Sequence, residues 1–164
     1  MSILSVSDIS KSYDKKKLAV ENLSFELNEG DFFGFLGPNG AGKSTTISLL
    51  SSLITPDKGE IYFQGENIIN IRKKYLSDVG FIFQDPPLDR NATVKSNLIF
   101  AGTLYNLNRK DIENNYLRLL KNFELLHLLE KKVLKLSGGE KRIIDICRAL
   151  IHQPKILFMD EPTT

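Results

Sequence analysis

The chain has 164 residues, enough for one domain with a real hydrophobic core. Its net charge is +2 with acidic and basic residues interspersed, so no basic block indicates nucleic acid as a partner. No apolar run approaches the ~20 residues of a membrane-spanning helix, the N-terminus does not resemble a signal peptide, and a single cysteine, Cys147, excludes an internal disulfide. We therefore expect a cytoplasmic protein that acts at a membrane only through another subunit.

The first sixty residues have the pattern of a β-sheet. Leu23, Phe25 and Leu27 alternate with polar neighbours, as in a strand with one buried face. Residues 59–63 form another strand-like run, which follows a turn signal at 56–59. The sequence thus predicts a sheet around the segment that follows.

Residues 37–44 fit a phosphate-binding pattern, in which two glycines with four residues between them are followed by Lys43 and Ser44. An apolar strand is predicted before this loop, over 31–36, and a helix after it, over 43–53. Glycines let backbone N–H groups converge on phosphate oxygens, and a helix start adds its positive end. Lys43 would supply a mobile charge for the outer phosphates, and Ser44 a hydroxyl for Mg²⁺. A chance glycine-rich turn is the alternative, and the flanking strand and helix count against it.

The middle of the chain changes from strand to helix. A second apolar strand over 79–83 is followed by Gln84 and then by two prolines that end it, so a polar side chain is left at the strand end. From 93 to 134 the pattern is helical and predicts a helical insertion. Its proposed apolar face consists of Ile112, Tyr116, Leu119 and Phe123.

A helix start is predicted at Ser137. Ser137 and Glu140 form a capping box ahead of a helix, which is a purely structural account of both residues. The apolar face of that helix contains Ile143, Ile146, Cys147 and Leu150. The capping box does not explain the consecutive glycines Gly138 and Gly139, which leave backbone N–H groups accessible to an anion. A second phosphate-facing surface is therefore predicted.

Residues 155–159 predict a buried strand of the parallel type, which ends in Asp160 and Glu161. Ligands gather outside the carboxyl ends of such strands, so Asp160 is predicted to support Mg²⁺. Glu161 can orient and activate a water. A solvated turn is the alternative for this acidic pair, and the phosphate loop counts against it. The two histidines, His127 and His152, are expected at the surface.

In their order along the chain, these motifs resemble the ATP-binding cassette family, the nucleotide-binding subunits of ABC transporters, over essentially the whole sequence. Residues 37–44 resemble the Walker A motif, 136–140 the signature motif, and 156–161 the Walker B motif with its catalytic glutamate. Gln84 resembles the Q-loop glutamine, and Tyr13 the aromatic residue that stacks on adenine.

The resemblance implies an α/β fold within one nucleotide-binding domain, 1–164. Its parts would be a P-loop NTPase core with a mostly parallel, RecA-like sheet, an N-terminal antiparallel β subdomain, and a helical subdomain at about 93–150. The residues expected to bind ATP are Tyr13, Gly37, Pro38, Asn39, Gly40, Ala41, Gly42, Lys43, Ser44, Thr45, Ser137, Gly138 and Gly139. The expected Mg²⁺ ligands are Ser44, Gln84 and Asp160, and the expected catalytic residues are Lys43 and Glu161. Glu140 departs from the usual Gln of the signature, and its capping role is expected to survive the change.

In the family, two domains pack head to tail, so the signature residues of one chain would act on ATP held by the other. The resemblance implies a homodimer bound to a separate transmembrane permease on the inner face of the membrane, with no nucleic acid partner. Residues 91–107 resemble cassettes of multidrug and ABC-2 type exporters. No histidine follows Glu161 to act as the family's switch, so we expect an N-terminal part of a cassette, truncated at the C-terminus. Two alternatives stay open, a non-hydrolysing nucleotide-binding fragment and a soluble ABC ATPase without a transport role.

Overall fold

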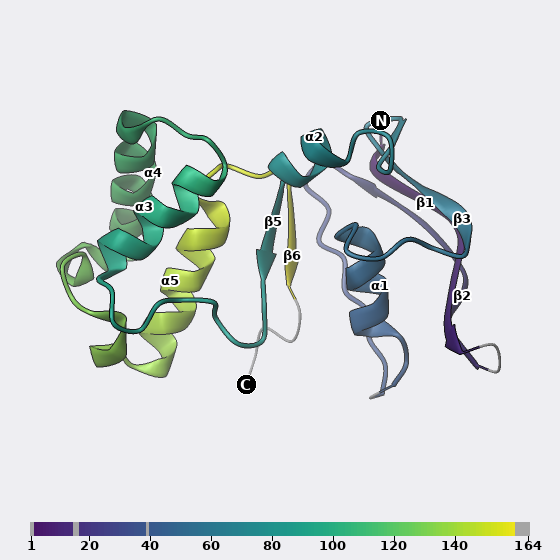
Figure 1. Ribbon diagram of the computed structural model, residues 1–164, viewed down its shortest axis with the longest axis horizontal. Helices are drawn as coiled ribbons and strands as arrows, with labels where there is room; N and C mark the ends of the chain where they lie inside the picture. The colour runs from purple at the N-terminus through teal and green to yellow at the C-terminus, as the bar shows by residue number, and fades with distance from the viewer. Residues whose placement is uncertain (1, 15–16, 39, 160–164) are drawn as a thin grey trace. The chain divides into compact units, whose positions relative to one another are not determined.

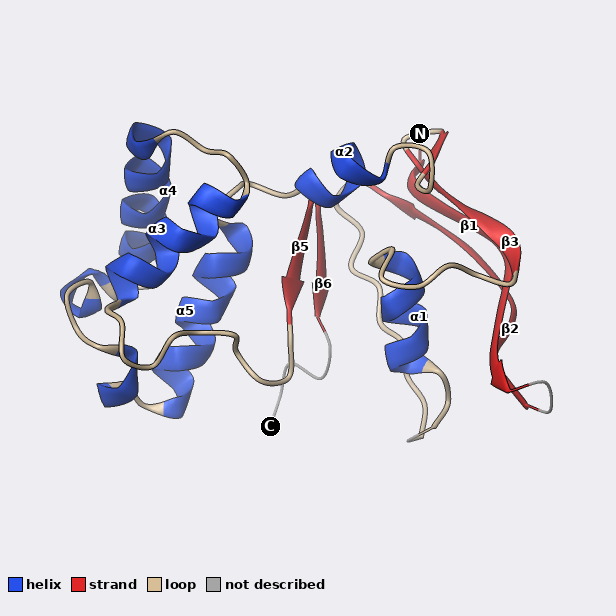
Figure 2. Cartoon of the chain, in the orientation of Figure 1, coloured by secondary structure: helices blue, strands red, loops and turns tan. Residues whose placement is uncertain are grey.

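The computed structural model describes residues 2–14, 17–38 and 40–159, and the chain forms two compact units, Met1–Leu76 and Ser77–Thr164 (Figure 1). Strands predominate in the first unit and helices in the second (Figure 2). The description of the whole chain as one domain with a helical subdomain stays a prediction.

The first unit contains a four-stranded antiparallel sheet with the strand order β2-β1-β3-β4. The central strand β1 (Ser2–Asp14) pairs with β2 (Lys17–Asn28) on one side and with β3 (Lys58–Phe63) on the other. The short strand β4 (Glu66–Asn67) continues the sheet beyond β3. Both strands predicted in this region, one around Leu23 to Leu27 and one over 59–63, are therefore confirmed.

The first unit also contains α1 (Lys43–Leu50) and all but the last residue of α2 (Arg72–Ser77). The Tyr75 side chain of α2 is fully buried and donates its hydroxyl to the carbonyl oxygen of Leu50 at 2.5 Å. Its ring also meets Phe63 of β3 at a centroid distance of 5.2 Å. The helix that follows the phosphate loop is thus anchored to the sheet, and its prediction is confirmed with an end at residue 50.

The prediction of a strand over 31–36 was wrong, because residues 31–38 form no strand in the structure. The side chains of this segment still point to two sides: Phe33 and Phe35 pack on Phe25 of β2, with ring centroids 4.9 and 5.7 Å away. On the opposite side Phe32 and Leu36 are 97% and 98% exposed. A strand requires a hydrogen-bonded ladder with a neighbour, and none of the described strands pairs with this segment.

The second unit contains three α-helices, α3 (Val94–Leu104), α4 (Arg109–Asn122) and α5 (Gly138–Leu150), which lie together in Figure 1. Two short 3₁₀ helices, η1 (Leu126–Leu128) and η2 (Val133–Lys135), link α4 to α5. Side chains from all five elements form one core, which includes Val94, Leu98, Ile112, Tyr116, Leu120, Leu128, Val133, Ile144 and Cys147. The prediction of helices between 93 and 134 is confirmed.

The apolar face predicted for α4 is correct except for Phe123. Ile112, Tyr116 and Leu119 are buried as expected, but Phe123 is exposed. The reason is that α4 ends at Asn122 and Phe123 is its C-cap, so the helical period no longer applies there.

A two-stranded parallel sheet completes the second unit. β5 (Val79–Ile82) pairs with β6 (Ile156–Met159), which confirms both predicted strands and their parallel type. β6 was expected to be buried, but only Phe158 is. The cause is that the described part of this sheet has only two strands, so β6 has no described neighbour on its other side. Of the helices in the described residues, none is long and apolar enough to cross a membrane.

Candidate nucleotide-binding site

The predicted phosphate loop lies in the first unit, between the 31–36 segment and α1. Gly40 and Gly42 have φ angles of +84° and +88°, on either side of Ala41. Left-handed residues placed this way turn successive N–H groups toward one concave side, which favours an anion. Gly42 is also the N-cap of α1, where no side-chain hydrogen bond caps the helix. The loop backbone therefore fits a phosphate group.

Gly42 is required at its position for a second reason, which is its close approach to β2. A Cβ on Gly42 would lie 2.2 Å from the carbonyl oxygen of Ala19. On the helix side, the carbonyl oxygen of Gly42 accepts hydrogen bonds from Thr46, from its N–H at 2.8 Å and from its hydroxyl at 2.9 Å. Gly42 thus joins the loop to both the sheet and α1.

The Lys43 side chain folds back over the loop. Its Nζ donates to the carbonyl oxygens of Gly37 and Pro38 at 2.6 and 3.1 Å. Ser44 is exposed and Thr45 half-buried in the same first turn of α1. The ammonium charge therefore lies at the loop, where the outer phosphates are expected.

The predicted signature residues lie at the start of α5. The capping box is confirmed: the Glu140 N–H donates to Ser137 Oγ at 3.3 Å, and the Ser137 N–H donates to Glu140 Oε2 at 2.7 Å. The hydrogen bond from the Ser137 N–H lowers the pKa of the Glu140 carboxyl. Gly138 and Gly139 are exposed, and a Cβ on either would meet nothing within 4 Å. This backbone can be approached closely by a ligand.

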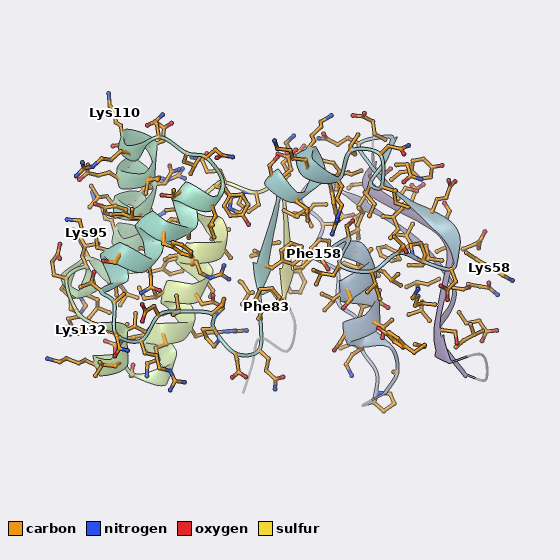
Figure 3. All side chains as sticks on the ribbon, in the orientation of Figure 1. Lys58, Phe83, Lys95, Lys110, Lys132 and Phe158 are labelled. Atoms are coloured by element: carbon orange, nitrogen blue, oxygen red, sulfur yellow. The ribbon has the colours of Figure 1, made fainter. Side chains whose placement is uncertain are left out.

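Gln84 lies just beyond β5 and is exposed. Figure 3 labels Phe83, at the end of β5, and Phe158, from β6. Phe81 stacks between them, with ring centroids 6.2 Å from Phe83 and 5.4 Å from Phe158. The strand end that carries Gln84 is thus built on stacked aromatic side chains.

The structure also reveals a charged cluster on α5 that was not predicted from the sequence. Asp145 is fully buried, and its Oδ1 accepts from Arg148 Nε at 2.7 Å. Arg142 Nη1 lies 3.7 Å from Asp145 Oδ2. Both arginines also donate to carbonyl oxygens of the β5 segment, Arg142 to Phe83 and Arg148 to Phe81. The sequence did contain a signal for this cluster. Asp145 lies three positions after Arg142 and three positions before Arg148, and this spacing places all three side chains on one face of a helix.

The prediction for one of the two histidines was wrong. His127 is exposed as expected, but His152 is half-buried. Its ring stacks on Tyr105 at a centroid distance of 3.5 Å, and its Nε2 lies 2.9 Å from the carbonyl oxygen of Val79. Burial lowers the pKa of His152. Its environment comes from residues distant in sequence, which the local pattern does not reveal.

The predicted site residues fall into three groups. The phosphate loop and Tyr13, whose side chain is 69% exposed on β1, belong to the first unit. Gln84 and the signature residues belong to the second. Asn39, Asp160 and Glu161 lie outside the described residues. Within residues 2–14, 17–38 and 40–159, no group of three His, Cys, Asp or Glu side chains could hold a metal ion.

Comparison with known proteins gives matches over nearly the whole chain. A sequence model of the ABC transporter family matches residues 20–164. The chain is 40% identical over 161 residues to the linearmycin resistance ATP-binding protein LnrL of Bacillus subtilis (strain 168). It is 37% identical over 161 residues to the bacitracin transport ATP-binding protein BcrA of Bacillus licheniformis. Each alignment covers 98% of this chain and 51% of the relative, so the chain spans about half the length of these curated relatives.

A solved structure is similar as well. It is cbiO1 from Clostridium perfringens, part of the ABC transporter complex cbiONQ, with a TM-score of 0.86 and 29% sequence identity. The alignment covers 99% of this chain and 66% of that chain. This likeness confirms the predicted fold class, a P-loop NTPase with an antiparallel β part and a helical part.

Proposed function

The chain belongs to the ABC transporter family, and on this premise we propose that it binds and hydrolyses ATP to drive substrate movement by a separate membrane permease. The observation that carries the proposal is the phosphate loop. Two left-handed glycines shape its backbone for an anion, and the Lys43 ammonium lies against it. The names of LnrL and BcrA refer to linearmycin resistance and bacitracin transport, which supports an exporter.

We assign the chemistry to residues as follows. The N–H groups of 37–44 and the Lys43 ammonium bind the phosphates, and Tyr13 stacks on adenine. Hydroxyl, amide and carboxylate oxygens suit Mg²⁺, so Ser44, Gln84 and Asp160 would hold it. When bound, Mg²⁺ stabilises charge that develops on the transferred phosphoryl group. Glu161 orients the attacking water and accepts its proton.

The open backbone at the start of α5 supports the proposed assembly. Ser137, Gly138 and Gly139 present exposed groups at a helix N-terminus, which favours the phosphates of an ATP molecule held by a second copy. We propose a two-fold homodimer with two equivalent sites, bound to a permease on the inner face of the membrane and without a nucleic acid partner. ATP would close the dimer, and hydrolysis would reopen it.

Phosphate release and gel filtration test this function. The Glu161→Gln chain should bind Mg-ATP, release phosphate far more slowly than the parent and elute as an ATP-dependent dimer. Glu21→Gln, an exposed change on β2, is the matched control and should behave as the parent. A parent chain that binds Mg-ATP without releasing phosphate would favour the non-hydrolysing alternative. Equal rates for the parent and Glu161→Gln would reject the role of Glu161.

A further inference from the structure

Two arginines of α5 bind the main chain at the carboxyl end of β5. Arg148 Nη2 donates to the carbonyl oxygen of Phe81 at 2.8 Å, and Arg142 Nη1 donates to that of Phe83 at 2.5 Å. Hydrogen bonds from a charged donor are about twice as strong as neutral ones. Phe83 directly precedes Gln84, so the second bond fixes the backbone next to a predicted nucleotide-site residue.

Asp145 keeps both arginines in place. It is fully buried, whereas the Arg142 and Arg148 side chains are 20% and 18% exposed. A buried carboxylate is costly unless cations and hydrogen bonds surround it, so the two guanidinium groups are held on this side of the helix. The carboxylate thereby orients donors whose targets lie on another element.

The two arginines are not held equally. Arg148 Nε lies 2.7 Å from Asp145 Oδ1, whereas Arg142 Nη1 lies 3.7 Å from Oδ2, beyond hydrogen-bond distance. Arg142 Nη2 and Asp145 Oδ2 are both buried and have no hydrogen-bond partner among the described residues. Arg148 therefore binds both Asp145 and β5, whereas the hydrogen bond of Arg142 goes to the strand end.

We propose that Arg142, oriented by Asp145, is a positioning residue that fixes the Gln84 segment to the helix that begins with the signature residues. Arg142 lies one helical turn beyond Gly138, so a displacement at Gln84 is passed through the Phe83 carbonyl to the start of α5. The link to nucleotide rests on the proposed function, whereas the attachment itself rests on the contacts within the second unit.

A spin label at position 85 tests the attachment directly. Asp85 is exposed and follows Gln84, and Asp85→Cys can be labelled selectively because burial raises the pKa of the only native thiol, Cys147, to about 12. In Arg142→Ala we expect the nitroxide at 85 to become several-fold more mobile. Arg109→Ala removes an exposed arginine from α4 and is the matched control, which should leave the spectrum unchanged.

Two further readouts separate positioning from a general loss of packing. A label at Arg118→Cys on α4 should keep its spectrum in Arg142→Ala. Arg142→Lys should restore order at position 85, because a single ammonium donor can reach one carbonyl oxygen. The proposal is overturned by an unchanged label at 85, by equal mobilisation at 85 and 118, or by a lysine variant that behaves like alanine.

Mg-ATP affinity then tests the link to the nucleotide site. Gln84→Ala and Arg142→Ala should each weaken binding about tenfold, and the double variant should bind no more weakly than Gln84→Ala. Factors that multiply would show that Arg142 does not act through Gln84. If Gln84→Ala binds Mg-ATP as the parent does, the proposed role of Gln84 fails, while the spin-label spectra still decide on the attachment.

Discussion

Gly42→Ala is the substitution whose cost the structure defines most closely. The residue has a φ of +88°, and a side chain in this conformation costs about 1–2 kcal/mol. The new Cβ would also lie 2.2 Å from the carbonyl oxygen of Ala19, a backbone atom that yields only if the start of β2 moves. Such overpacking costs about 1–3 kcal/mol. The free energy of unfolding should therefore fall by about 2–5 kcal/mol, and the Tm by at least about 4 °C.

Two other glycines serve as matched controls in thermal unfolding. Gly40→Ala has a φ of +84° with nothing within 4 Å of its Cβ, so it should lose only about 1–2 kcal/mol. Gly30 lies in the turn after β2, has a φ of +88° and likewise has nothing within 4 Å of an added Cβ. Gly30→Ala should therefore lose as much stability as Gly40→Ala, and it should not weaken Mg-ATP binding. Equal Tm values for Gly42→Ala and Gly40→Ala would refute the close contact between the loop and β2.

The remaining predictions in this group concern a buried histidine, a helix cap and a metal ligand. Burial lowers the pKa of His152, so its contribution to stability is full above the ordinary histidine pKa of about 6.5 and is lost as the pH falls below it. Urea unfolding gives the free energy of unfolding at several pH values between about 7.5 and about 5.5. The pH dependence of this free energy should be mostly lost in His152→Gln but not in His127→Gln. Ser137→Ala should cost about 1 kcal/mol through loss of the helix cap. Because the pKa of Glu140 is lowered, its cap should stabilise the chain fully at pH values above the ordinary glutamate pKa. This stabilisation should be lost as the pH falls through the lowered pKa. In Glu140→Gln, an acid titration of stability should not show this loss. Asp160→Asn should weaken the Mg²⁺ dependence of ATP affinity while Mg-free binding persists, and an unchanged dependence in a titration would reject Asp160 as a ligand.

The features that the sequence predicted well are those whose contacts are local. Both hydrogen bonds of the capping box join Ser137 to Glu140, three residues apart. The phosphate loop likewise closes on itself, because Lys43 bonds to Gly37 and Pro38. Apolar alternation identified β2 because one of its faces packs into the unit. In each case, a few neighbouring residues determine the conformation.

The failures involve contacts between residues distant in sequence. The 31–36 segment has the apolar composition of a strand but no hydrogen-bonded neighbour among the described strands. His152 is half-buried because Tyr105, 47 positions earlier, stacks on it. Asp145 was not singled out because its importance depends on arginines that reach carbonyl oxygens of the β5 segment. The periodicity of a sequence predicts which face of a segment is buried, but it does not predict which other segment packs against that face.

The most direct test of the account is a calorimetric titration of Mg-ATP into the parent chain and into Lys43→Ala. The Lys43 ammonium lies at the loop, so its loss should remove most of the affinity. Lys58→Ala removes the same charge from an exposed position on β3 and should bind as the parent does. We predict saturable binding to the parent and to Lys58→Ala, with little or none to Lys43→Ala. Equal affinities for the parent and Lys43→Ala would contradict the claim that residues 37–44 bind the phosphates of ATP.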